Sequence, residues 1–240
     1  TVYIITTNWQ GRSKLSYSLI DGINVYWAPL SYRNNMSYLK RTFIFIRFIW
    51  YILSIGWKLH FDLIIASSTP LTISIPSIVL KKIKGVKMIF ETRDLWPQLP
   101  IAIGAIKSKL LIKLANWLEK TTYNNSNHII CLSSGMKTEL SSIIPKGKVT
   151  VVTNLSDVNR FQNKKGINRL RIPNFGDNPL ILYAGSFGRI NGLIYLVQIA
   201  KVMKKINPNL LFLLAGDGYD KDRIISKSKE YGILNKTLYK

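Results

Sequence analysis

The sequence predicts an α/β fold in which helices pack on parallel sheets, divided into two domains. Short apolar, β-branched runs alternate along the chain with segments of helical length. Two of these runs, 63–66 and 180–183, are apolar at every position, as in strands whose two faces are both buried. A stretch at 156–179, rich in Asn, Gly and Pro, separates two such patterns. We therefore expect βαβ units with helices on both faces of each sheet.

The elements follow from these runs and from the residues between them. The predicted strands are 2–6, 23–28, 62–67, 86–91, 127–132, 148–153, 179–184 and 210–215. The predicted helices are 38–59, 70–83, 107–122, 134–144, 191–206 and 219–231. Gly85 lies between a helix and a strand, where a helix C-cap is typical, and Pro70 and Pro145 lie near helix edges. We expect an amino-terminal Rossmann-like domain at 1–158, a linker at 159–178 and the start of a second such domain at 179–240.

Both domains are expected to be incomplete. The chain begins at Thr1 inside a predicted strand, without an initiator Met or a signal peptide, so a first strand and its loop are expected before residue 1. The chain reaches Lys240 on entering another strand. The second domain would then hold only two complete strands, too few to close a core, and is expected to be strongly truncated.

Composition narrows the class of protein. The chain has 240 residues, of which 47% are hydrophobic and 19% charged, a globular mixture. Its net charge of +22 predicts an anionic partner, which is a nucleic acid, an anionic membrane or a phosphorylated substrate. Most aromatic residues lie within apolar runs and no compact basic run occurs, which disfavours nucleic acid. Cys131 is the only cysteine, so no internal disulfide can form, which fits a reducing compartment.

The predicted helix at 38–59 is unusually apolar. Four of its polar side chains fall on one narrow stripe at about 100° per residue: Lys40, Arg47, Ser54 and Lys58. A transmembrane span is disfavoured because the apolar run is shorter than ~20 residues and has Arg47 in its middle. Two interpretations stay open: a core helix, and an interfacial helix that places aliphatic and aromatic groups at lipid headgroups. These two can coexist, with one face on the sheet and one on lipid.

A polar cluster follows the predicted strand at 86–91. Glu91, Arg93 and Asp94 come at its carboxyl end, where open α/β sheets bind their ligands. A carboxylate there can orient a hydroxyl, and an arginine can hold a phosphate. The alternative is an ion-pair network that fastens the loop. Ser67 to Pro70 likewise open a helix after a strand and can bind an anion or simply cap the helix.

Two glycine-bearing turns mark the second domain. Gly185 and Gly188 allow a ligand to approach the backbone, the helix that follows favours phosphate, and Arg189 can add a charged contact. The segment is neither a Walker loop nor a dinucleotide fingerprint. The turn at 216–218 ends the next strand, and its alternative is an ordinary βα turn. A metal site is not expected, because the two histidines are isolated and there is no cysteine cluster.

These pieces together resemble a known family. The segments occur in a characteristic order: Ser-Ser-Thr-Pro at 67–70, Glu-Thr-Arg-Asp-Leu-Trp-Pro at 91–97, Leu-Ser-Ser-Gly-Met-Lys at 132–137, Thr-Asn-Leu-Ser-Asp at 153–157, Tyr-Ala-Gly-Ser-Phe-Gly at 183–188, Asn-Gly-Leu at 191–193 and Ala-Gly-Asp-Gly at 215–218. The set resembles family 4 glycosyltransferases of the GT-B fold. Within that family it is most similar to bacterial O-antigen, capsule and colanic acid enzymes, including fucosaminyltransferase-like members.

The resemblance implies a function and a set of site residues. The enzyme would transfer a sugar, with retention of configuration and without a metal or other cofactor, from a nucleotide sugar to a polyprenyl-diphosphate-linked glycan. It would work in the cytoplasm, peripherally on the inner face of the membrane, through the helix at 38–59. The implied catalytic residues are Asp94, Arg93 and Glu91. The implied donor-binding residues are Gly185, Ser186, Phe187, Gly188 and Arg189, with Gly216, Asp217 and Gly218 near the nucleotide.

The sequence departs from the family pattern at three places. The glycine-rich first loop is absent before residue 1, the Glu-x7-Glu donor motif is absent after residue 240, and Asn191 stands where many members have lysine. The alternative interpretation is therefore an inactive fragment of such an enzyme that binds at most a membrane or a partner.

Overall fold

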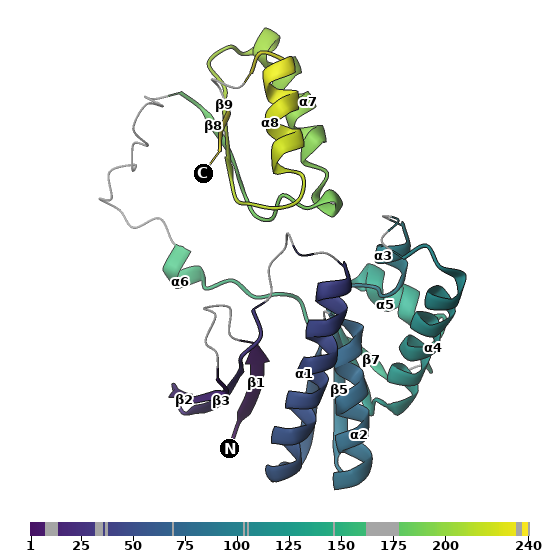
Figure 1. Ribbon diagram of the computed structural model, residues 1–240. Coiled ribbons are helices and arrows are strands. Elements are labelled where there is room, and N and C mark those ends of the chain that lie inside the picture. Colours follow the sequence, from purple (N-terminus) through teal and green to yellow (C-terminus); the bar gives the residue numbers. More distant parts are fainter. Residues whose placement is uncertain are drawn as a thin grey trace. The chain divides into compact units, whose positions relative to one another are not determined.

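The chain folds into two compact α/β units, 1–156 and 157–240 (Figure 1). The computed structural model describes residues 1–7, 14–31, 36, 38–68, 70–102, 104, 106–145, 147–161, 178–233 and 237–239. The division follows Ser156, close to the expected end of the first domain at 158. Most of the expected linker at 159–178 lies outside the described residues, which resume at Asn178.

The strands of the first unit form two sheets. One sheet has the order β1-β3-β2, with β1 at Tyr3–Thr7, β2 at Ser16–Ile20 and β3 at Ile23–Ala28. The other has the order β4-β5-β6-β7 and is parallel throughout, with β4 at Leu63–Ser67, β5 at Lys87–Thr92, β6 at His128–Cys131 and β7 at Val149–Val151. Their helices are α1 at Tyr38–Lys58, η1 at Leu71–Ile73, α2 at Ser74–Lys84, α3 at Gln98–Ala102, α4 at Lys109–Asn125 and α5 at Ser134–Ser141.

The hairpin of β2 and β3 was not predicted from the sequence. Asp21 and Gly22 connect the strands with φ values of 49° and 79°, and Ile20 pairs with Ile23. Two successive positive φ values are typical of a two-residue type I′ turn, for which Asp-Gly is a preferred sequence. The signal was therefore present, in an Asp-Gly pair between two runs of β-forming residues.

The core of the four-stranded sheet lies on one of its faces. Ala66, Phe90, Ile129 and Val149 form one row across the paired strands, and all four are buried together with helix residues such as Tyr123. The adjacent row of residues lies on the opposite face of the sheet and begins at Ile65, which is 65% exposed. The expectation of helices on both faces is thus wrong for the described part of this sheet. The crossovers from β4 to β7 all step in the same direction, and right-handed crossovers then place their helices on the same face.

The helix α1 has one buried face and one exposed apolar face. Ile52 and Ile55 are buried, and Gly56 lies so close to α2 that a Cβ there would meet Leu80. The exposed side carries a stripe of large apolar residues: Leu39, Phe43, Ile46, Trp50 and Trp57. No helix within the described residues is long and apolar enough to cross a membrane. The core interpretation therefore accounts for one face of α1 and leaves the other face apolar in solvent.

The second unit is a smaller parallel α/β layer. Its sheet has the order β10-β9-β8, with β8 at Leu180–Ala184, β9 at Leu211–Ala215 and β10 at Thr237–Tyr239. The remaining elements are α6 at Val158–Phe161, η2 at Arg189–Asn191, α7 at Leu193–Ile206 and α8 at Lys221–Glu230. Phe187, Val197, Phe212 and Ile224 belong to its buried core. Leu182 lies on the opposite face of the sheet and is 60% exposed.

Candidate functional site

A polar cavity of about 520 Å³ lies at the carboxyl ends of β4 to β7 in the first unit. Its lining residues come from the loops that follow four parallel strands: Ser67, Ser68, Arg93, Asp94, Leu132 and Asn154. The structure thus brings the predicted residues Arg93 and Asp94 to a cavity, where both side chains are exposed. This position is the one at which parallel α/β sheets bind ligands.

Glu91 lies beside this cavity and organises its wall. The Ser67 hydroxyl donates a hydrogen bond to the Glu91 carboxylate, and the Ser68 amide donates to the Glu91 carbonyl at 2.9 Å. The Arg93 amide donates to the buried Ser68 hydroxyl at 3.0 Å. These bonds tie the ends of β4 and β5 together. The Glu91 carboxylate is engaged by Ser67 and is not among the residues that line the cavity, and its predicted catalytic role stays a prediction.

A buried network supports the loop that carries Asp94. The Thr92 hydroxyl donates to the Asp94 carbonyl at 3.0 Å, and the Tyr123 hydroxyl donates to the Glu119 carboxylate at 3.1 Å. Burial raises the pKa of Glu119, and burial together with the neighbouring Glu119 carboxylate raises the pKa of Tyr123. Tyr123 also interacts with Thr92, which joins the two bonds into one network.

This network was not predicted from the sequence. Its signal is a Glu and a Tyr four residues apart in α4, a spacing that places both on one face of a helix. Glu119 and Tyr123 are buried, so a carboxylate occurs on the inward face of an otherwise amphipathic helix. The spacing of Glu119 and Tyr123 in the helix gives no reason to expect an interaction with Thr92 of β5.

Two glycine turns of the second unit pack directly on each other. The Gly185 amide donates to the Ala215 carbonyl and the Phe187 amide to the Asp217 carbonyl, both at 2.9 Å, which extends the pairing of β8 with β9. Gly216 has a φ of 153°, and a Cβ at this position would lie 1.8 Å from the Gly185 carbonyl oxygen. Only glycine fits such an approach.

Gly218 meets the same condition, with a φ of 156° and a Cβ position 2.8 Å from the Phe187 backbone. The glycines at 216 and 218 are therefore explained by the contact between the two turns. Asp217, between them, has an exposed side chain 3.6 Å from the Lys221 Nζ atom.

The predicted donor-binding residues at 185–189 divide into two groups. Phe187 is completely buried in the core, and its amide and that of Gly185 are engaged by the neighbouring turn, so these two residues hold the fold. The Ser186 and Gly188 amides form no hydrogen bond with any of the described residues and can meet an anion. Phe187 was expected among the donor-binding residues as part of the segment 185–189, and the structure places its side chain in the core.

Arg189 lies at the start of η2 and is held from two sides. Its Nε atom is 3.9 Å from Asp220 Oδ1, and its guanidinium carbon lies 4.6 Å from the centre of the Tyr219 ring. The side chain is still 56% exposed, and a guanidinium has five N–H donors. Asn191 donates to the Ser186 carbonyl through its amide nitrogen, which secures the same turn.

Metal ligands do not gather in the described part of the chain. Among these residues, no group of three or more His, Cys, Asp or Glu side chains is arranged to hold a metal ion. The two sites hold hydroxyls, carboxylates, arginines and backbone amides.

The amino-terminal two thirds of the chain match the sequence profile of a known protein family. The sequence profile of Glycosyltransferase Family 4 matches residues 1–160. A search of curated protein sequences gives no match.

Three solved structures share the fold. Sucrose-phosphate synthase from Thermosynechococcus elongatus aligns over 100% of this chain with a TM-score of 0.75 and 16% identity. HepE from Anabaena, in complex with UDP-glucose, aligns over 100% with a TM-score of 0.66 and 12% identity, covering 69% of that protein. S. aureus MnaA, in complex with UDP, aligns over 100% with a TM-score of 0.59 and 9% identity, covering 68% of that protein. The chain spans 60% of the synthase. The predicted fold class, two α/β units of the GT-B type, is confirmed.

Proposed function

This chain belongs to Glycosyltransferase Family 4, and we propose that it serves sugar transfer from a nucleotide-sugar donor to a membrane-associated glycan acceptor. The proposed acceptor is a polyprenyl-diphosphate-linked glycan of surface polysaccharide biosynthesis, and the proposed transfer retains the anomeric configuration. The observation that carries the proposal is the polar cavity in which Arg93 and Asp94 lie at the carboxyl ends of parallel strands.

The second unit offers the groups that a nucleotide-sugar diphosphate requires. Charge develops on the leaving diphosphate during transfer and must be neutralised by preorganised donors. The Ser186 and Gly188 amides are unengaged by the described residues, and Arg189, the next residue along the chain, has an exposed guanidinium. Two of the similar structures, HepE and MnaA, were solved with UDP-glucose and UDP, which supports a nucleotide sugar as donor. With amides and arginine in this role, the proposed reaction needs no metal ion.

Asp94 is the proposed catalytic carboxylate of the acceptor side. Its side chain is exposed at the cavity, and Thr92 fixes its carbonyl from beneath. A carboxylate in this position can accept the proton of an acceptor hydroxyl, while Arg93 can bind a phosphate of the lipid carrier. We expect Asp94→Ala to abolish transfer to a lipid-linked acceptor and to leave nucleotide-sugar affinity within about twofold, because Asp94 belongs to the other unit. Unimpaired turnover in this variant would show that Asp94 is structural.

The exposed face of α1 supports a membrane-associated acceptor. Trp50 and its apolar neighbours are exposed, and Lys40, Arg47 and Lys58 lie at the edge of this stripe. Apolar and basic groups arranged in this way favour an anionic lipid surface such as the inner face of the cell membrane.

The alternative function is binding of a membrane without transfer of a sugar. It is supported by the stripe of exposed apolar side chains on α1. Thermal-shift measurements with a panel of nucleotide sugars separate the two possibilities. Stabilisation by a nucleotide sugar supports the transferase, whereas a chain that sediments with anionic vesicles and responds to no nucleotide sugar supports the alternative.

A further inference from the structure

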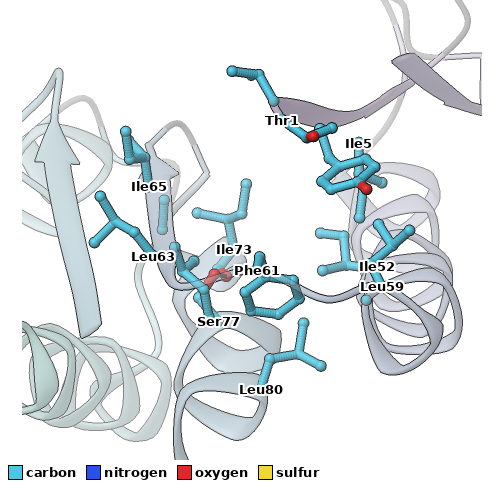
Figure 2. Close-up of a pocket in the computed structure, with 15 residues that line it drawn as sticks. Thr1, Ile5, Ile52, Leu59, Phe61, Leu63, Ile65, Ile73, Ser77 and Leu80 are labelled. Atoms are coloured by element: carbon cyan, nitrogen blue, oxygen red, sulfur yellow. Dashed lines mark hydrogen bonds between the residues drawn. The ribbon is translucent and has the colours of Figure 1, made fainter. Parts of the chain in front are cut away.

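The turn at 185–188 of the second unit contains an acceptor as well as two unengaged donors. The carbonyl group of Ser186 lies between these two amides along the chain. Partial charges of like sign repel, so a site that holds an anion must keep such an oxygen covered or turned away. The apolar cavity of about 350 Å³ in the first unit offers an anion no charged side chain, and its lining is mostly aliphatic, as at Ile52 and Leu80 (Figure 2). The direction of the Ser186 carbonyl therefore matters for the anion site of this chain.

The Ser186 amide points to the open side of the turn. A Cβ on Gly216 would lie 1.8 Å from the Gly185 carbonyl oxygen, so this oxygen lies against Gly216. The peptide group that joins Gly185 to Ser186 is trans, and in a planar trans peptide the N–H is directed opposite to the C=O. The Ser186 amide is therefore directed away from the neighbouring turn at 216–218.

The next two peptide groups alternate in the same way. The Phe187 amide donates to the Asp217 carbonyl, so the Ser186 carbonyl, at the other end of that peptide group, points to the open side. The Phe187 carbonyl accepts a hydrogen bond from the Asp220 amide at 2.9 Å, so the Gly188 amide points to the open side as well. The open side of the turn thus carries two donors with a carbonyl oxygen between them.

Two side chains engage this carbonyl oxygen. The Tyr183 hydroxyl donates to the Ser186 oxygen at 2.9 Å, and the Asn191 side-chain amide donates to it as well. A carbonyl oxygen has two lone pairs, and these two donors occupy both. Gly185 leaves room for the tyrosine, because a Cβ there would lie 2.9 Å from the Tyr183 hydroxyl oxygen. The one acceptor on the open side is therefore covered by donors.

We propose that Tyr183 and Asn191 are positioning residues of the donor site, which cover the Ser186 carbonyl oxygen so that the turn presents only N–H donors to a diphosphate. This inference rests on the proposed function, because it concerns the turn to which the donor diphosphate is assigned. Without the two side chains, a partially negative oxygen would face the phosphate oxygens and repel them. With them, the donors are fixed before the ligand arrives and need no reorganisation.

The test is calorimetric titration of UDP into the parent chain and three variants. We expect Tyr183→Phe to weaken UDP binding about threefold to tenfold, the range that one hydrogen bond spans. Asn191→Asp keeps the shape of the side chain but replaces the donor by a charged acceptor, so it should weaken binding at least about tenfold. Tyr195→Phe is the matched control, because it removes a hydroxyl from a 70% exposed tyrosine of α7, and it should leave the affinity unchanged. Unchanged affinity in both Tyr183→Phe and Asn191→Asp would overturn the proposal.

Hydrogen exchange distinguishes covering of the oxygen from mere support of the turn. The Phe187 amide is bonded to the Asp217 carbonyl, on the side of the turn opposite to the Ser186 oxygen. Its exchange rate in Tyr183→Phe, without UDP, should stay within about twofold of the parent. A loss of this protection in proportion to the loss of UDP affinity would show that the turn only loosens, and would overturn the proposal.

Failure of this inference and failure of the proposed donor site have different signatures. If Arg189→Ala weakens UDP binding and Tyr183→Phe does not, the donor site stands and only the role of the covered carbonyl is refuted. If the parent chain does not bind UDP, both the donor site and this inference are refuted.

Discussion

Replacement of Gly216 by alanine should unfold the second unit selectively. A Cβ at this position would lie 1.8 Å from the Gly185 carbonyl oxygen, whereas ordinary contacts lie at 3.4–4 Å, so the two turns must separate by more than an ångström. A side chain at a φ of 153° costs about 1–3 kcal/mol, and loss of the bond from the Gly185 amide to Ala215 costs about 1 kcal/mol. We expect Gly216→Ala to lower the free energy of unfolding of this unit by about 2–4 kcal/mol.

The chain contains an internal control for this measurement. All six tryptophans belong to the first unit: Trp9, Trp27, Trp50, Trp57, Trp96 and Trp117. In urea titrations, tryptophan fluorescence should therefore show the same midpoint for the variant and the parent. Hydrogen exchange of β8 and β9, which reports on the second unit, should shift to lower urea concentrations.

Gly188→Ala is the matched substitution in the same turn. Gly188 has a negative φ of −84°, and a methyl group added there would have no neighbour closer than 3.6 Å, so the change should alter stability by less than about 0.5 kcal/mol. If Gly216→Ala and Gly188→Ala unfold the second unit at the same urea concentration, the close approach of the two turns is not what requires glycine at 216.

Two further predictions concern the first unit. Burial raises the pKa of Glu119 above 4.5, so the folded state holds a proton that the unfolded state has lost, and stability falls as pH rises through the raised pKa. Glu119→Gln removes this loss, so the melting temperature of the variant, relative to that of the parent, should increase between pH 4 and pH 8. A difference in melting temperature that stays constant over this pH range would contradict a buried carboxyl. On α1, Trp50→Asp should reduce co-sedimentation with anionic vesicles at least about tenfold, because a 64% exposed aromatic is replaced by an anion. Trp117→Asp, at 63% exposure on α4, is the control, and equal loss in both variants would exclude α1 as the specific contact.

The extent to which the sequence predicts this fold depends on the period of each segment. The run at 63–66 is apolar at every position, and the strand predicted at 62–67 lies within one residue of β4. The hairpin at Asp21 and Gly22 was missed, although its dipeptide signal was present. Whether helices cover one face or two depends on the direction of successive crossovers, which is a property of strand order that a local pattern does not contain.

Some residues of the candidate site could be predicted from the sequence and others could not, for similar reasons. Arg93 and Asp94 were found because polar residues after an apolar strand must emerge at the carboxyl edge of the sheet. Phe187 was expected at the donor as part of the segment 185–189 that the resemblance implies, and its side chain lies in the core. The direction of a side chain in a turn follows from backbone angles that the sequence alone did not reveal. The network of Glu119, Tyr123 and Thr92 joins a helix to a strand, and such a contact between distant segments has no local signal.

The most direct test of the proposed donor site is calorimetric titration of UDP and UDP-glucose into the parent chain, Arg189→Ala and Arg223→Ala. Arg189 directly follows the turn that carries the two unengaged amides, whereas Arg223 is an exposed arginine of α8, so the two variants have the same net charge. A charge-assisted hydrogen bond to a diphosphate contributes about 1.5–3 kcal/mol, so Arg189→Ala should weaken binding at least about tenfold and Arg223→Ala should leave it unchanged. The absence of binding by the parent chain, or equal affinities in the two variants, would contradict the assignment of the donor diphosphate to this turn.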